Sequence, residues 1–390
     1  MNKRVIFIGG GASSLVNAVL LKKEEPSFDI FIIEKDKKLG KKLSATGGGK
    51  CNIAPLKDNP YVYNLDSIDL VTSLFKEYPL DKYLGLLEKA GIATKTIKDY
   101  GYYPIHESAP QVVKNLYHQI NKLGIKVIYD EFVDYESSSN KVTVKLKEQT
   151  LETDYLIIAT GGLNGDMSRI FNKHNVITTQ IKPGLCPIKV KENVTKLFGC
   201  RFEAFITLLY KKNTVKQLYG EVLFKKDGLS GIPLLNISSS IARRKDEYKN
   251  DDFQISIGLP KDLDINIMGM SIEETLLTLF KEEYANYLME KHHFDRKEII
   301  DSSNQSKVLK VISDERFTFD SLYDFKDAQV TIGGVSLGEI DKKFSLRNDK
   351  NIFVVGEVLD VDGICGGYNL RFAITSGFKA IASILNRQKR

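Results

Sequence analysis

The feature that most constrains this chain is its N-terminal run from Lys3 to Ser14, KRVIFIGGGASS, in which a short apolar segment breaks into three glycines. A second apolar segment, Ile30 to Ile33, ends at Glu34. This pattern predicts a buried strand, a tight turn, a helix and a second strand that ends in a carboxylate. Such a turn lets the backbone approach a pyrophosphate, and such a carboxylate accepts hydrogen bonds from an adenosine ribose. The first hypothesis is therefore an adenine dinucleotide cofactor.

The glycines alone also fit an ordinary strand-to-helix turn. The dinucleotide fingerprint has a third glycine where this chain has Ser14. The flanking segments favour the cofactor, because residues 5–8 are typical of a buried strand and apolar residues recur at helical spacing from Leu15 to Leu20.

Length and composition limit the class of protein. The 390 residues are 42% hydrophobic and 27% charged, as in a globular protein, and they are enough for two or three structural units. The net charge of +6 is spread along the chain, which permits anionic ligands but does not indicate nucleic-acid binding. Glycines interrupt the apolar residues that follow Arg4. We therefore interpret this N-terminal segment as part of the folded protein and not as a signal peptide. No apolar run has the length of a transmembrane helix, so we expect no membrane partner and a cytoplasmic location.

The cysteines and histidines do not predict a metal site. The chain has no CxxC pair, and its four cysteines are typical of reduced thiols: Cys51, Cys186, Cys200 and Cys365. Cys51 and Cys365 fall in glycine-rich loops, where packing against neighbours is the favoured interpretation and contact with a cofactor is the alternative. His292 and His293 stand in a charged stretch that is typical of a solvated surface.

Two further glycine-rich segments are candidates for cofactor contact. Residues 40–52 are rich in glycine and lysine, so their backbone N–H groups can form an anion nest to which Lys42 or Lys50 adds a charge. The alternative is a flexible surface loop.

Residues 356–369 follow an expected strand over 351–355 and precede a helix for which Asn369 is the expected N-cap. A helix N-terminus there suits the negative charge of a reduced flavin, whereas the alternative is a plain strand-loop-helix corner. Two such corners in one chain suit a large extended cofactor, and FAD fits that description.

The first 181 residues have the pattern of alternating helices and strands. Helices are expected over 68–78, 80–90 and 110–123, strands over 126–133 and 156–162, and a small antiparallel excursion over 140–147 and 150–155.

From about Lys182 the pattern changes. Residues 182–260 are β-rich, and residues 261–325 are expected to be helical, with a capping box from Ser271 to Glu274 and a helix from Arg296 to Ile312. The pattern therefore predicts an α/β fold in which residues 182–325 form an insertion, β-rich first and helical afterwards.

The most specific motifs are GKKLSATGGGKCN over residues 40–52 and GEVLDVDGICGGYNLRFAITSG over residues 356–377. Together with GGGASS at 9–14, ATGG at 159–162 and QVTIGGV at 329–335, they extend over nearly the whole chain. In these motifs the chain resembles the BaiN/RdsA-type flavoproteins, the aminoacetone oxidase family of FAD-binding enzymes. The resemblance implies a glutathione-reductase-like, Rossmann-like FAD-binding domain formed by both chain ends, residues 1–181 and 326–390. A β-barrel-like insertion and a helical insertion would interrupt that domain.

The resemblance also implies roles for individual residues. Gly9, Gly11 and Ala12 would contact the pyrophosphate, Glu34 the ribose, and the backbone of Val133 the adenine. At the other end of the cofactor, the ribityl chain would meet Gly356 and Glu357, and the flavin ring Asn369 and Leu370. The predicted cofactor-binding set is completed by Ser13, Lys35, Lys42, Thr46, Gly47, Asn52, Ala159, Thr160, Gly161 and Gly367.

The favoured hypothesis is an FAD-dependent oxidoreductase with a small-molecule substrate. The sequence has no second dinucleotide fingerprint, so NADH or NADPH would bind transiently as the electron donor. The sequence assigns no catalytic acid or base, substrate or oligomeric state. Three alternatives remain: a flavoprotein that modifies RNA, a dehydrogenase that holds NAD at the N-terminal glycines, and a flavin-binding sensor without turnover.

Overall fold

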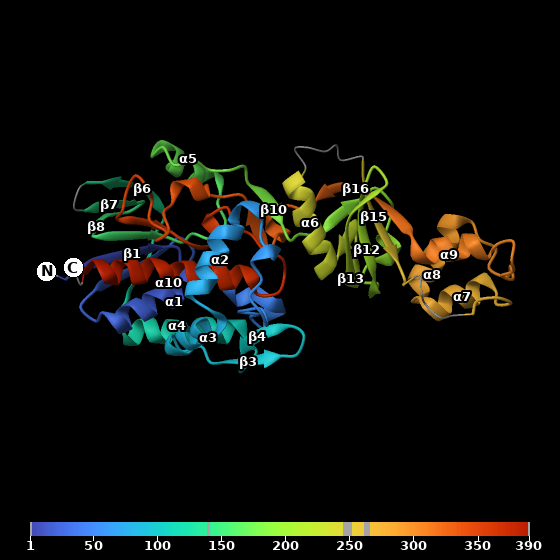
Figure 1. Cartoon of the computed structure of the whole chain (residues 1–390), viewed down its shortest axis with the longest axis horizontal. Coiled ribbons are helices and arrows are strands. Elements are labelled where there is room, and N and C mark those ends of the chain that lie inside the picture. Colours follow the sequence, from blue (N-terminus) through green and yellow to red (C-terminus); the bar gives the residue numbers. More distant parts are fainter. Residues whose placement is uncertain (1, 139–140, 245–251, 261–265, 389–390) are drawn as a thin grey trace. The chain divides into compact units, whose positions relative to one another are not determined.

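The computed structural model describes residues 2–138, 141–244, 252–260 and 266–388 (Figure 1). The chain divides into two compact units. Unit 1 consists of Met1–Ile181 and Thr331–Arg390, and unit 2 consists of Lys182–Val330. The predicted division of the insertion at residue 260 stays a prediction. Two short strands, β10 (Lys182–Gly184) and β17 (Val330–Ile332), lie where the chain passes between the units.

Unit 1 is built on a parallel five-stranded sheet, as the sequence predicts. Its strand order is β18-β9-β1-β2-β5. Ile8 lies beside Ile33 on one side and Ile158 on the other, so the carboxyl ends of three strands meet at one edge. The strands are β1 (Arg4–Ile8), β2 (Asp29–Glu34), β5 (Lys126–Tyr129), β9 (Tyr155–Ile158) and β18 (Ile352–Val354).

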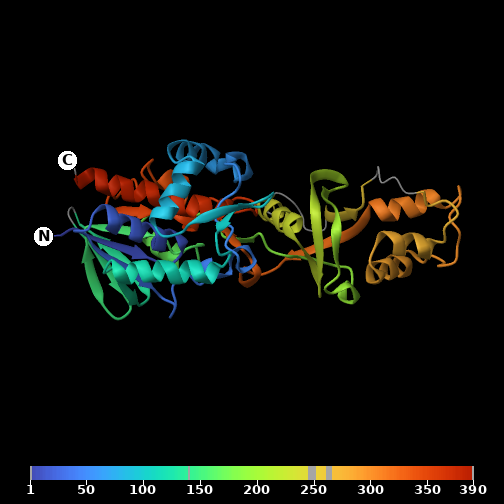
Figure 2. The ribbon, with the colours of Figure 1, turned by 90° about the horizontal axis from the view of Figure 1, so that it is seen from below.

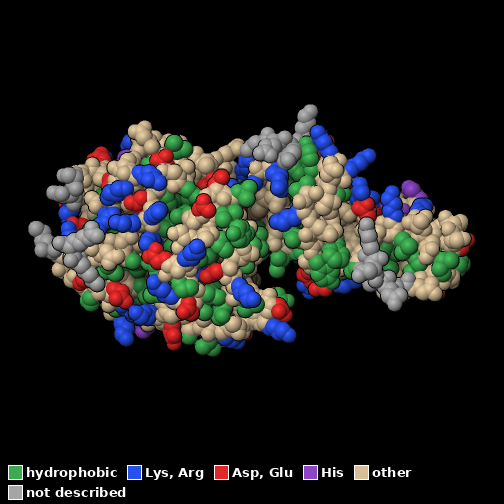
Figure 3. All heavy atoms as spheres, in the orientation of Figure 1, with side chains coloured by type: hydrophobic (Ala, Val, Ile, Leu, Met, Phe, Trp, Pro, Cys, Tyr) green, Lys and Arg blue, Asp and Glu red, His purple; other side chains and the backbone are tan. Residues whose placement is uncertain are grey.

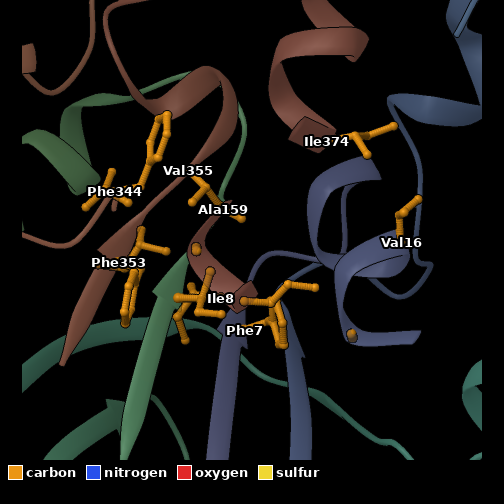
Figure 4. Close-up of a cluster of buried hydrophobic side chains, with 14 of the residues drawn as sticks. Phe7, Ile8, Val16, Ala159, Phe344, Phe353, Val355 and Ile374 are labelled. Carbon is orange, nitrogen blue, oxygen red and sulfur yellow. The ribbon is translucent and has the colours of Figure 1, made fainter. Parts of the chain in front are cut away.

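Successive residues inside β1 and β2 are buried, whichever face of the sheet they lie on. Apolar residues on both faces are expected for a parallel sheet that helices and loops cover on both sides. Figure 4 shows Phe7 and Ile8 of β1 near Phe353 of β18, with Val16 and Ile374 coming from two helices. Phe7, Phe353 and Val16 are each at most 1% exposed. Burying a side chain of this size stabilises the fold by roughly 1.5–3 kcal/mol.

Two helices from opposite ends of the chain, α1 (Ala12–Glu24) and α10 (Tyr368–Gln388), pack against each other in unit 1 (Figures 1 and 2). A Cβ atom on Gly377 would lie 2.1 Å from Nδ2 of Asn17, so glycine is required for this close approach. The same nitrogen donates to the carbonyl oxygen of Ile374 at 3.2 Å. The other helices of unit 1 are α2 (Ile68–Glu77), α3 (Leu80–Lys89), α4 (Ala109–Lys122) and α5 (Gly165–Lys173).

One predicted strand of unit 1 is wrong in its extent. The segment 126–133 divides into β5 and β6 (Phe132–Ser137), because Asp130 turns the chain by accepting the N–H groups of Glu131 at 2.7 Å and Glu148 at 3.2 Å. The expected antiparallel excursion is present as the sheet β6-β7-β8, although Asn140 lies outside the described residues. The remaining strands are β7 (Val142–Leu146), β8 (Thr150–Thr153) and the hairpin β3 (Thr94–Ile97) with β4 (Gly101–Pro104).

Unit 2 contains the barrel that the family resemblance implies for the β-rich segment. Six strands close in the order β11-β14-β13-β12-β15-β16. Its core includes Ile206, Phe224, Phe253 and Phe317, each at most 1% exposed. The strands are β11 (Ile188–Val190), β12 (Arg201–Tyr210), β13 (Asn213–Lys225), β14 (Gly228–Ser230), β15 (Phe253–Gly258) and β16 (Glu315–Leu322).

The helices of unit 2 differ partly from the sequence expectation. The capping box between Ser271 and Glu274 is present at the start of α7. The helix expected from Arg296 begins only at Gln305, because the carbonyl oxygens of Arg296 and Glu298 accept the first N–H groups of α7. The range 261–325, which was expected to be helical, also contains β16. The range 182–260, which was expected to be β-rich, also contains α6. The helices are α6 (Ile232–Arg244), α7 (Ile272–Leu279), α8 (Glu282–His292) and α9 (Gln305–Ser313).

Short 3-10 helices complete the description: Leu43–Gly49 (η1), Pro60–Val62 (η2), Leu65–Ser67 (η3), Thr195–Leu197 (η4), Phe325–Asp327 (η6), Leu337–Glu339 (η7) and Gly356–Val358 (η8). On the face of unit 1 in Figure 3, basic and acidic side chains occur side by side. In the described ranges, no helix combines the length and the apolar character needed to cross a membrane.

Candidate cofactor site

We call residues 9–14 together with Glu34 the N-terminal corner. Gly9 directly follows β1 with φ +96°, and a Cβ atom there would lie 2.6 Å from the carbonyl oxygen of Ala159. Gly11 precedes α1, provides no side-chain cap, and has open space where a Cβ atom would be. The first N–H groups of α1, which include those of Ala12 and Ser13, are therefore available to an anion. The predicted turn is present and open to a ligand.

Glu34 is held in place by the backbone at the end of β2. One carboxylate oxygen accepts the N–H of Gly10 at 2.7 Å, and the other accepts the N–H of Asp36 at 2.8 Å. Each oxygen keeps a further lone pair, so the carboxylate can also accept hydrogen bonds from ribose hydroxyls. Lys35 follows directly and is exposed.

Several polar atoms at the start of α1 and after β9 are buried without a hydrogen-bond partner among the described residues. They are Oγ of Ser13 and of Ser14 and Oγ1 of Thr160, and Oδ1 of Asn52, which follows η1, also has no such partner. An unpartnered buried polar atom costs about 1–3 kcal/mol, so such a group of atoms fits a site that a polar ligand completes. A cofactor with phosphate and hydroxyl groups could supply the missing hydrogen-bond partners. The hydroxyl of Ser14, which replaces the third glycine of the fingerprint, was not in the predicted site.

The glycine-lysine segment 40–52 folds around η1. Gly47 has φ +57°, and a Cβ atom on it would lie 2.6 Å from the backbone nitrogen of Asn52. Thr46 donates its hydroxyl to the carbonyl oxygen of Leu43 at 2.7 Å, and Asn52 donates its amide to that of Tyr100 at 2.9 Å. These contacts give the segment a defined conformation, in contrast to the flexible-loop alternative.

We call residues 356–370 the C-terminal corner. Gly356 has φ +79° and donates its N–H to Oγ of Ser376 at 2.9 Å. The carboxylate of Glu357 accepts the N–H of Thr331 at 2.9 Å and contacts Nζ of Lys42 at 2.7 and 2.8 Å. Lys42 therefore neutralises Glu357, and the sequence did not predict that these two residues are partners.

Asn369 is not the N-cap of α10, which corrects the sequence expectation. The helix begins at Tyr368, and the N–H of Arg371 donates to the carbonyl oxygen of Gly367 at 3.0 Å. The Asn369 side chain instead fixes the preceding loop, accepting the N–H of Gly363 at 2.8 Å and donating to its carbonyl oxygen at 2.9 Å. The helix starts two residues before Leu370, the first helical residue expected from an Asn369 cap, and this leaves the Asn369 side chain free to bind the loop.

Gly367 brings the two ends of unit 1 into contact. Its φ is +86°, and a Cβ atom there would lie 2.7 Å from Oδ1 of Asn52 and from the carbonyl carbon of Ala54. Leu370 is partly buried against the core of unit 1. The fold therefore brings together predicted site residues from two segments, residues 40–52 and the C-terminal corner.

The remaining predicted residues lie at the sheet edge or in β6. Ala159 is 5% exposed and follows β9, and Gly161 has φ +78°. Val133 lies in β6 and is half exposed, so its backbone role toward an adenine stays a prediction.

Two thiols lie near the predicted site, but neither is a ready nucleophile. Burial raises the pKa of Cys51 to about 11 and that of Cys365 to about 12. Both thiols are therefore protonated at neutral pH. Within the described part of the chain, no cluster of histidine, cysteine and acidic residues could hold a metal ion.

One family model and several known proteins match nearly the whole chain. The family model described as "HI0933-like protein Rossmann domain" matches residues 3–383. A 3-dehydro-bile acid delta(4,6)-reductase from Clostridium scindens is 26% identical, with 97% of this chain and 98% of the relative covered. A ribosomal RNA dihydrouridine synthase from Haemophilus influenzae is 28% identical over the same shares of both chains. A protein of the same name from Escherichia coli is 24% identical, with 97% of each chain covered.

Among solved structures, E. coli quinol fumarate reductase FrdA matches all of this chain and 71% of its own, with a TM-score of 0.51 and 14% identity. This likeness supports the fold. The family match spans both corners, the sheet and the insertion. The chain therefore belongs to the HI0933-like family of FAD-binding Rossmann proteins, of the BaiN/RdsA type, and is a flavin-dependent oxidoreductase.

Proposed function

We propose that this protein holds FAD between its N-terminal and C-terminal corners, takes electrons from NADH or NADPH, and reduces a small organic substrate. The observation that carries the proposal is the open strand edge at Gly9, Gly11 and Glu34 beside buried polar atoms that lack partners. A dinucleotide supplies both the phosphates and the hydroxyls that such a set would bind. The cytoplasmic location stays a prediction.

In this proposal the chain's own residues bind and orient the cofactor. The N–H groups after Gly11 would bind the pyrophosphate, and Glu34 would accept ribose hydroxyls while keeping its two backbone contacts. Glu357 would bind ribityl hydroxyls and exchange or share its contact with Lys42. FAD, when bound, supplies the redox chemistry. The protonated thiols of Cys51 and Cys365 argue against a dithiol route.

The names of the relatives suggest the substrate class. One relative is named a delta(4,6)-reductase of a bile acid, and two are named dihydrouridine synthases. Both kinds of name describe reduction of a carbon-carbon double bond. We therefore favour a small compound with a double bond conjugated to a carbonyl group. A uridine in ribosomal RNA is the second candidate, and only the names of two relatives favour it.

An absorbance spectrum followed by anaerobic titration with NADH and with NADPH tests the proposal. We expect a yellow protein whose flavin bleaches with one of the two nucleotides, which identifies the donor. Colourless protein that cannot be reconstituted with FAD would overturn the proposal. Retention of ribosomal RNA at low salt, together with dihydrouridine formation measured by mass spectrometry, would replace the small-molecule substrate with RNA.

A further inference from the structure

A fully buried arginine lies at the start of α10, directly after the predicted flavin contact Leu370. The side chain of Arg371 is 0% exposed, and its Nε and Nη2 atoms each lie 3.0 Å from an oxygen of Asp58. Nη1 donates to Oγ1 of Thr375 at 2.5 Å, and Nη2 also donates to the carbonyl oxygen of Tyr78. The guanidinium thus makes a two-point contact with a carboxylate from a distant part of the sequence.

Aromatic rings enclose the same group. The guanidinium carbon lies 4.4 Å from the ring centre of Phe75 and 4.2 Å from that of Tyr83. Tyr83 in turn donates its hydroxyl to the carbonyl oxygen of Ile53 at 3.0 Å. Arg371 therefore connects α10 to α2, α3 and the segment around Asn52, whose Oδ1 atom lies beside Gly367.

Stability alone does not account for this arrangement. Arg371 is fully buried and its partner Asp58 is 19% exposed, and a well-packed apolar pair of similar size often gives equal or greater stability than such an ion pair. The pair does fix the position of Asp58 relative to α10. Both side chains lose rotational freedom, and the planar guanidinium allows only one bidentate arrangement with a carboxylate. The pair also places a permanent positive charge where solvent screens charges weakly, balanced by the partly exposed carboxylate of Asp58.

We propose that Arg371 is a positioning residue of the flavin site, and that the balance of charge between Arg371 and Asp58 sets the reduction potential of the bound flavin. The inference rests on the proposed FAD binding. Asp58 holds the segment before η2 against the first turn of α10, so that Gly367, which precedes that turn, keeps its place beside Asn52. A reduced flavin carries negative charge, so uncompensated positive charge in this region raises its potential and uncompensated negative charge lowers it.

The test is the midpoint potential of FAD in the purified holoenzyme, measured by anaerobic reductive titration against a reference dye. Asp58→Asn leaves the guanidinium without its carboxylate, so we expect a higher potential and a several-fold larger reduced-to-oxidised ratio at a fixed dye potential. Arg371→Gln leaves the carboxylate alone, and we expect a lower potential. The double variant Asp58→Asn with Arg371→Gln should return close to the native value. A purely structural role would weaken folding in all three variants without shifts of opposite sign.

Asp154→Asn is the matched control. Asp154 is also a buried carboxylate of unit 1, and it accepts the N–H of Arg4 at 2.8 Å where β1 begins, at the opposite edge of the sheet. We expect this variant to lose stability and to keep the native potential. Should Arg371→Gln not fold, Asp58→Asn and Arg371→Lys decide the matter, because lysine keeps the charge and should keep a near-native potential. A native potential in FAD-bound Asp58→Asn, or in FAD-bound Arg371→Gln, would overturn this inference alone, whereas absence of FAD from the native protein would overturn the proposed function.

Discussion

The N-terminal and C-terminal corners have similar glycine-rich sequences, but they differ in how their polar groups are occupied. At the N-terminal corner, α1 begins without a side-chain cap and the hydroxyl of Ser13 has no partner. At the C-terminal corner, Gly356 bonds Ser376, Glu357 bonds Thr331 and Lys42, and Asn369 bonds Gly363. One corner is preformed for a ligand, whereas the other satisfies its own hydrogen bonds.

This difference teaches that a glycine-rich turn before a helix does not by itself define a free anion site. The N-terminal corner needs no rearrangement before it binds a phosphate, so its contribution to cofactor affinity is preorganised. The C-terminal corner must exchange or share contacts, and its binding energy is reduced by the contacts that it gives up. Variants at the first corner should therefore have larger effects on FAD affinity than variants at the second.

The largest effect is expected for Gly9→Ala. The new Cβ atom would lie 2.6 Å from the carbonyl oxygen of Ala159, and the backbone φ of +96° disfavours any residue with a side chain. We expect unit 1 to lose about 1–3 kcal/mol of stability from backbone strain, with most bound FAD lost. The urea-unfolding midpoint and the flavin-to-protein ratio after gel filtration measure both effects.

Gly11→Ala is the matched control for this prediction. It lies in the same turn, but its φ is −86° and a Cβ atom there meets no atom within 4 Å. We expect near-native stability, with any loss confined to FAD binding, because only the cofactor would approach this position. Equal destabilisation of the two variants would show that the turn is rigid throughout and contradict the account of an open corner.

The next effect concerns Glu34→Gln. Hydrogen bonds to a charged acceptor contribute about 1.5–3 kcal/mol, so we expect the Kd for FAD to rise about 10- to 100-fold. Quenching of flavin fluorescence on binding measures this constant. Asp36→Asn, two residues along the same segment, removes the same charge from a side chain that accepts from Lys41. An equal loss in both variants would point to net charge and not to a specific ribose contact.

A smaller effect is expected for Lys42→Met and Glu357→Gln. The lysine side chain is 55% exposed, and an ion pair of this kind contributes about 0–1 kcal/mol. We expect each variant to change the Kd for FAD by less than about tenfold, and the effect of Lys42→Met to disappear in the Glu357→Gln background. Lys41→Met is the control, because its partner is Asp36. Additive effects in the double variant would indicate that Lys42 contacts the cofactor directly.

The two corners also differ in how well the sequence predicts them. The apolar strands and Glu34 have a strong local pattern, so the parallel sheet and the first turn were predictable. The β-rich character of the insertion was also predictable from its pattern, whereas its barrel form was expected from the family resemblance. The pairing of Lys42 with Glu357 joins residues far apart in the sequence, and no local signal indicates it. The start of α10 was predicted two residues late, because asparagine is a common N-cap and its bonds to Gly363 depend on the folded loop. Arg371 carried a weak signal as a charged residue within an apolar helix face.

The smallest effect, close to none, is expected when iodoacetamide is added to the native protein at pH 7.5. With the pKa of Cys51 near 11 and that of Cys365 near 12, burial keeps both thiols protonated, and at most about one molecule in a thousand carries either thiolate. Labelling measured by mass spectrometry should increase as the pH rises toward these values, and denatured protein should label at all four cysteines. Cys365 belongs to the C-terminal corner, so its protection reports whether that corner stays closed. Rapid labelling of Cys365 at pH 7.5, with Cys51 protected, would mean that the corner opens without a ligand. The two corners would then differ in how often they open and not in how many of their polar groups have hydrogen-bond partners. In that case, added FAD should slow the reaction at Cys365.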